Sequence, residues 1–124
     1  MKRTQAELLN LITKPEARER LKAEREAIIA EPIDNIQVAT IEDREKIQGA
    51  VDYFDEIADE SGLKLWIMAD NSISYLTKEA MAALTPSYIL RVDKAFTAYA
   101  LAAMALEAAT TLEEINSIKV ELSE

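Results

Sequence analysis

The sequence predicts an α+β protein that is predominantly α, a helical domain with one short β-hairpin at about 63–76 and an N-terminal helical arm. Over most of the chain, apolar residues recur three and four positions apart, which places them on one face of a helix. The stretch LWIMADNSISYLT at 65–77 instead alternates with period two around a polar Asp-Asn pair. A break at Pro32–Asn35 divides the chain into the arm, 1–32, and a compact domain, 33–124.

Composition excludes several classes of function. The chain of 124 residues contains no cysteine and no histidine. Disulfides, thiol nucleophiles, the commonest general base and the commonest metal ligand are therefore absent. The longest apolar run, 95–106, is shorter than the roughly 20 residues of a membrane span, so we expect a buried helix and no membrane insertion. The N-terminus, MKRTQAELLNLIT, is too polar for a signal peptide.

The net charge of −9 lies entirely in residues 36–124, because residues 1–35 carry seven basic and seven acidic side chains. An acidic body repels phosphate backbones, so no nucleic-acid partner is expected. The alternating charges of the arm are typical of a solvated helix face.

The arm combines strong helix signals with a narrow apolar stripe. Thr13-Lys14-Pro15-Glu16 reads as a capping box that opens a helix over 14–30, and Pro32 follows its end. A stripe as narrow as a coiled-coil seam favours a homo-oligomer formed through the arm. An arm folded back onto its own domain and a mobile arm are the alternatives. The stripe consists of Leu8, Leu11, Ile12, Ala17, Leu21 and Ile28.

Capping signals divide the compact domain. After a short strand at 36–38, Thr40 with Asp43 and Thr111 with Glu114 each match the capping-box spacing. Gly49 lies within a predicted helix, where it costs about 1 kcal/mol relative to alanine, so we expect another element to approach closely there. The predicted helices are 41–60, 78–84, 86–109 and one from 112 to 122.

Asp70-Asn71 supplies the short polar residues that a tight hairpin turn tolerates. A two-stranded hairpin is marginal alone, so we expect it to pack on the helix of 86–109 with Trp66 as its anchor. The side chains expected to be buried are Val51, Phe54, Trp66, Ile67, Tyr88, Val92, Phe96, Leu101 and Ile115.

No catalytic constellation is visible. Asp52, Asp55 and Asp59 recur at helical spacing and could bind Ca²⁺ or Mg²⁺. No calcium-loop spacing accompanies them, so a solvated acidic face is the better interpretation. We therefore expect no enzyme, no catalytic residue, no cofactor and no metal.

Five stretches follow one another along the chain: IQVATIED at 36–43, KIQGA at 46–50, LWIMADN at 65–71, LT at 76–77 and AATTLEEI at 108–115. The most specific part is the hairpin followed by Leu-Thr and a helix. In this order the stretches resemble a small, functionally uncharacterised domain family of tailed-bacteriophage tail-fibre and tail-associated proteins, and the resemblance covers about 36–120.

This resemblance implies a tail-associated structural component, a connector or fibre-attachment module that acts by protein–protein interaction in the virion. The alternative is a cytoplasmic assembly chaperone that is absent from the mature particle. In both cases the partners are tail or tail-fibre proteins, and tail symmetry favours a trimer or another ring. The expected interaction residues are Leu8, Leu11, Ile12, Leu21, Ile28 and Trp66.

Overall fold

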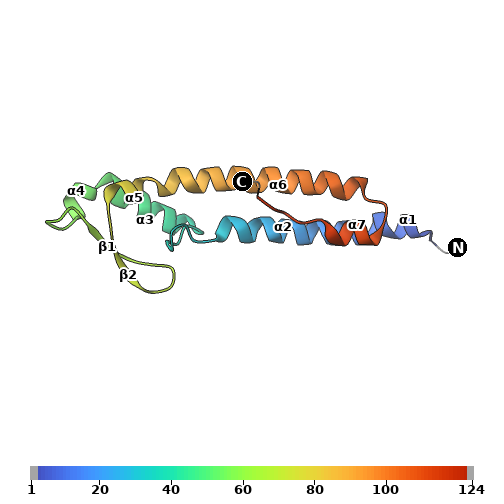
Figure 1. Cartoon of the computed structure of the whole chain (residues 1–124), viewed down its shortest axis with the longest axis horizontal. Helices are drawn as coiled ribbons and strands as arrows, with labels where there is room; N and C mark the ends of the chain where they lie inside the picture. The colour runs from blue at the N-terminus through green and yellow to red at the C-terminus, as the bar shows by residue number, and fades with distance from the viewer. Residues whose placement is uncertain (1–2, 123–124) are drawn as a thin grey trace. The chain divides into compact units, whose positions relative to one another are not determined.

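The computed structural model describes residues 3–122 and confirms a predominantly helical α+β fold with one antiparallel hairpin. Figure 1 shows the elements in chain order. They are α1 (Gln5–Leu8), η1 (Leu9–Thr13), α2 (Lys14–Ala30), α3 (Ile41–Asp52), α4 (Phe54–Ile57), β1 (Lys64–Ile67), β2 (Ile73–Leu76), α5 (Lys78–Ala82), α6 (Leu84–Ala108) and α7 (Leu112–Ser117).

The chain forms two compact units. The first contains the described residues up to Ile28 and from Val92 onward, and the second is Ile29–Arg91. The predicted boundary after residue 32 lies close to the Ile28/Ile29 division. The first unit, however, combines the N-terminal arm with the C-terminal part of the chain.

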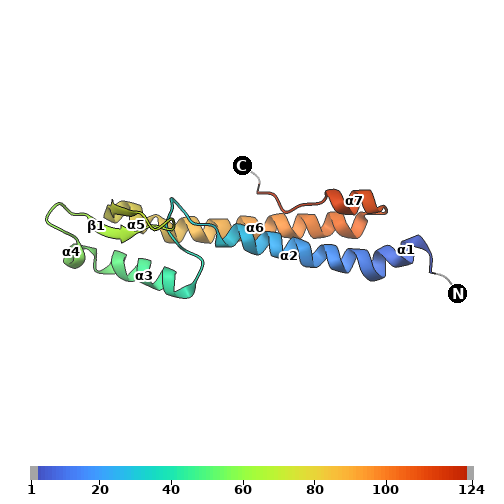
Figure 2. The same ribbon diagram turned by 90° about the horizontal axis from the view of Figure 1, so that it is seen from below.

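In the first unit, α2 and α7 lie beside the C-terminal half of α6 (Figures 1 and 2). The arm thus folds back onto its own chain, the first of the two alternatives to self-association. Lys14 Nζ donates to the carbonyl oxygen of Glu107 at 3.0 Å, close to the C-terminus of α6, where a cation is favoured. The buried side chains are Leu9, Ala17, Leu21, Ala102, Leu106, Ala109, Ile115 and Val120.

The arm helix begins earlier than predicted. Thr4 caps it by accepting a hydrogen bond from Glu7 N–H at 3.1 Å, and the helix continues through a π-helical turn, η1, into α2. The predicted start at Thr13 is therefore wrong. Pro15 has no N–H to donate to the preceding turn, and such interruptions of the hydrogen-bond ladder accompany local changes of helix geometry.

In the second unit, α3, α4, the hairpin, α5 and the start of α6 enclose a separate core. Ile33 and Ile36 exchange two backbone hydrogen bonds, 3.0 and 2.8 Å long, across a turn in which Asp34 and Asn35 both have positive φ. Ile36 takes part only in this isolated bridge, so the short strand predicted at 36–38 is wrong. The buried side chains are Ile33, Ile36, Val38, Ile47, Ala50, Phe54, Met68, Met81 and Leu84.

The helix predicted over 41–60 is interrupted at Tyr53, whose side chain is 64% exposed, while Phe54 is buried. The last helix ends at Ser117, short of the predicted 122. An added Cβ at Gly49 would meet nothing within 4 Å, so the expected close approach is also wrong. Within residues 3–122, no helix combines the length and apolarity that a membrane crossing requires.

Burial is confirmed for Phe54 and Ile115, whereas Ile67, Phe96 and Leu101 are exposed. The α6 face that meets α2 is buried, and Leu101 lies on another face. Phe96 is 48% exposed and lies under the guanidinium of Arg25, at 4.4 Å from the ring centroid. The side chains of Val51, Trp66, Tyr88 and Val92 are only partly buried.

Candidate interaction site

The hairpin has a three-residue turn. Met68 N–H donates to the carbonyl oxygen of Ser72 at 2.8 Å, and Asn71 N–H donates to that of Met68 at 2.9 Å. Asn71 adopts the left-handed conformation with φ 69°, as expected for the last residue of such a loop. The Asp-Asn pair therefore forms a turn.

Asp70 and Asn35 hold this turn in place. Asp70 Oδ1 accepts hydrogen bonds from Ser72 Oγ at 2.6 Å and from Ser72 N–H at 2.9 Å. The backbone carbonyl oxygen of Asn35 accepts a hydrogen bond from the Ala69 N–H at 2.6 Å. The side-chain Oδ1 of Asn35 accepts one from the Asp70 N–H at 3.2 Å. The Ser72 hydroxyl, with help from the Asn35 side chain and the Ser72 N–H, lowers the pKa of Asp70 to about 2.

The two faces of the hairpin have different surroundings. The inner face carries Trp66, Met68 and Leu76, which pack against the core of the second unit. The outer face carries two apolar cross-strand pairs, Leu65 with Tyr75 and Ile67 with Ile73. Their exposed fractions are 45% for Leu65, 69% for Ile67, 64% for Ile73 and 60% for Tyr75.

We call these four residues the outer face. None of them is among the interaction residues predicted from the sequence, although the predicted residue Trp66 lies between Leu65 and Ile67 on β1. The sequence signal for this surface is the period-two alternation of side chains along the hairpin strands. It did not identify the solvent side, because both sides of β1 are largely apolar.

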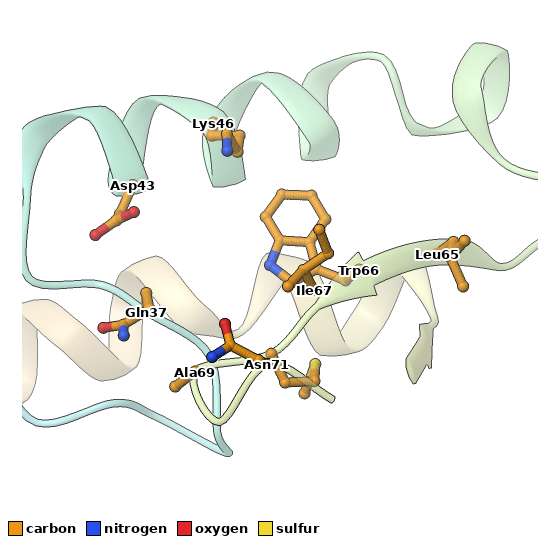
Figure 3. Close-up of a pocket in the computed structure, with 9 residues that line it drawn as sticks. Gln37, Asp43, Lys46, Leu65, Trp66, Ile67, Ala69 and Asn71 are labelled. Atoms are coloured by element: carbon orange, nitrogen blue, oxygen red, sulfur yellow. The ribbon is translucent and has the colours of Figure 1, made fainter. Parts of the chain in front are cut away.

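A concavity of about 400 Å³ lies along β1. Figure 3 shows the Trp66 indole directed from β1 toward α3, with Asp43 and Lys46 on that helix. Gln37, Ala69 and Asn71 lie below Asp43 in the same view, and Leu65 lies on the opposite side. The site therefore offers an aromatic ring, both signs of charge and side-chain amides within a space large enough for a short peptide segment.

The arm residues named from the sequence lie in different environments. Leu8, Leu11 and Ile12 are 40, 55 and 51% exposed, while Ile28 is partly buried against the core of the first unit. Leu21 has no exposed surface. Other residues of the same chain cover Leu21 completely, so in this conformation Leu21 cannot contact a second copy of the protein. Self-association through the remaining arm residues stays a prediction.

The three aspartates of the acidic segment do not converge. Asp52 accepts a hydrogen bond from the Gln48 side chain at 2.9 Å, and Asp55 pairs with Lys78 at 3.5 Å. Asp59 follows the end of α4 and accepts from backbone N–H groups of the next loop. In the part of the chain that the structure describes, no group of three carboxylates could hold a metal ion.

Residues 12–120 match the family described as a domain of unknown function, DUF4376, and the chain belongs to this family. The match begins within η1 and includes all of α2, whereas the resemblance noted above began only at residue 36. No curated protein and no solved structure matches the chain.

Proposed function

We propose that this member of the DUF4376 family is a tail-associated structural component of a tailed bacteriophage, a connector or fibre-attachment module that acts by protein–protein contact. The observation that carries the interaction is the outer face, four large apolar side chains in cross-strand pairs that remain 45 to 69% exposed. Contiguous exposed apolar surface of this kind commonly marks an interaction site. The phage context rests on the sequence resemblance over 36–120.

Charge supports a protein partner. The second unit, which carries the outer face, has five basic and twelve acidic side chains, a net charge of −7. Such a surface repels nucleic acid and attracts basic protein surfaces. The chain lacks histidine and cysteine, which leaves binding as the role that its side chains serve best.

Mass spectrometry of purified particles of the encoding phage tests this function. We expect the protein in a stoichiometric ratio to a tail or fibre protein. Its absence from particles, together with its recovery on a tail protein from infected cells, would favour the assembly chaperone. A gene neighbourhood without tail or fibre genes would contradict both phage roles.

The outer face is tested separately by pull-down from infected cells. A variant with Ile67→Thr and Ile73→Thr should lose the tail protein, because two of the four apolar contacts are removed. Leu101→Thr is the matched control, since Leu101 is 62% exposed but belongs to the first unit. Equal loss with the control would show that the outer face is not the contact surface.

A further inference from the structure

We infer that the free edge of β1 binds an extended, cationic segment of a partner protein, which joins the hairpin as a third strand. The inference deepens the proposed function and rests on its assumption that the protein acts by protein–protein contact. It specifies that the partner binds by backbone hydrogen bonds to one edge of the hairpin. It also specifies the kind of partner segment that forms these bonds.

The register determines which backbone groups face this edge. In antiparallel pairs, hydrogen-bonded and non-hydrogen-bonded residue pairs alternate. The Met68 N–H donates to the Ser72 carbonyl, so position 68 faces β2, and so do positions 66 and 64. The N–H and C=O groups of Leu65 and Ile67 therefore point away from β2, toward the free edge.

Both ends of this edge are already paired. At one end, Leu63 N–H donates to Asp59 Oδ1 at 3.0 Å, and the Leu63 carbonyl accepts from Asp59 N–H at 2.8 Å. At the other end, the Ala69 N–H donates to the Asn35 carbonyl at 2.6 Å. Between them, the backbone N–H groups of Leu65 and Ile67 donate to no other group of residues 3–122. The open edge is thus a bounded segment.

The open edge borders the 400 Å³ concavity. Leu65, Trp66 and Ile67 form one side, and Asp43 and Lys46 of α3 lie across from them (Figure 3). At about 3.3 Å per residue, an added strand of three to four residues would span the open edge. Main-chain hydrogen bonds would supply affinity, and side-chain contacts in the concavity would supply specificity.

Charge identifies the occupant. A second copy of the chain would bring another unit of net charge −7 against the first, whereas a segment containing lysine or arginine would be attracted. An added strand also extends the outer face, so every second residue of the partner segment should be apolar to cover Leu65 and Ile67. A basic, alternately apolar segment of another protein satisfies both conditions.

The test uses the full chain and the synthetic peptide acetyl-KITITIK-amide, with the emission of Trp66, the only tryptophan, as the binding signal. On binding, amide hydrogen exchange should slow at Leu65 and Ile67 and stay unchanged at Ile73 and Tyr75. If the peptide adds antiparallel to β1, its isoleucines lie opposite Leu65 and Ile67 and their backbone N–H groups donate to the edge. Methylation of the isoleucine nitrogens should therefore weaken binding at least about tenfold, and methylation of the threonine nitrogens should have little effect.

Two proline variants supply a matched pair within the protein. Ile67→Pro and Ile73→Pro each remove one isoleucine from the outer face and one N–H that points away from the hairpin, but on opposite edges. We expect binding to weaken about tenfold or more with Ile67→Pro and less than about twofold with Ile73→Pro. If Ile67→Pro disrupts the hairpin, the methylated peptides on the unaltered chain decide the question.

Several results would overturn the inference. These are no binding of the peptide, protection of Ile73 and Tyr75 instead, equal effects of the two methylation patterns, or protection of Leu65 and Ile67 that rises with protein concentration alone. The last result would identify a second copy as the occupant. Tighter binding of acetyl-EITITIE-amide would contradict the charge argument. Because these measurements need no phage, they can fail while the particle analysis succeeds, and the reverse also holds.

Discussion

Replacing Leu21 by alanine tests whether α2 is held by its own chain. The Leu21 side chain is fully buried, and the substitution removes three carbon atoms, which corresponds to about 2.4 kcal/mol of lost transfer free energy. The buried core that contains Leu21 also contains Ala17 and Ala102, whose side chains are too small to fill the space left behind. The cavity therefore adds to the cost, and we expect a total loss of about 3 to 4 kcal/mol in the free energy of unfolding.

Urea unfolding followed by far-ultraviolet circular dichroism measures this loss. Leu11→Ala is the control, because Leu11 is 55% exposed and its truncation should cost less than about 0.5 kcal/mol. A loss below about 1 kcal/mol for Leu21→Ala would refute the fold-back packing.

Three further changes test local features. Gly49→Ala should stabilise the protein by about 0.5 to 1 kcal/mol in urea unfolding, because Gly49 is helical and an added Cβ has free space. Gly62→Ala should destabilise it by about 1 kcal/mol or more, since Gly62 has φ +76°. The pKa of Asp70 is lowered from 3.8 to about 2, so its contribution to stability is present above pH 4 and is lost as pH falls through about 2. Asp70→Asn should remove this pH dependence, and a carboxyl titration by NMR that gives Asp70 an ordinary pKa would contradict the assignment.

Local signals predicted part of the local structure. Thr40 and Thr111 each accept a hydrogen bond from the backbone N–H three residues later, so these two helices begin where their caps indicated, whereas the same signal at Thr13 lies inside a continuous helix. Capping depends only on neighbouring residues and can therefore be recognised in the sequence. The interruption at Tyr53 has no such signal, since neither glycine nor proline stands there. It shows that one continuous apolar stripe does not ensure one continuous helix.

The packing of the arm could not be predicted in the same way. Its stripe is narrow, and three of the residues that cover it, Ala98, Ala102 and Ala109, are alanines. Alanines contribute little to a hydrophobic pattern, but they allow a helix such as α2 to approach α6 closely. Which of the alternatives the arm adopts thus depends on α6 and α7, far away in the sequence.

At the candidate site, too, the local sequence pattern is not enough to predict the packing. Both sides of β1 are apolar, with Leu65 and Ile67 on one and Trp66 and Met68 on the other, so alternation alone leaves the buried side undetermined. The core of the second unit takes Trp66 and Met68, and their neighbours are left exposed. The sequence could place a hairpin here, but only the fold distinguishes its anchoring side from its outer face.

This separation of the two sides has a consequence for stability. A hairpin of two strands is marginal, and three strands with an apolar face are the smallest arrangement that is stable on its own. Asn35 and the inner side chains hold the two strands in the free protein, while the outer face and the β1 edge stay available. A partner segment that adds a third strand would therefore bind and stabilise the hairpin at once. By linkage, it should raise the unfolding temperature, and once the segment is in excess over its Kd the stabilisation should grow with the logarithm of its free concentration, with no change in the buried core that defines the fold.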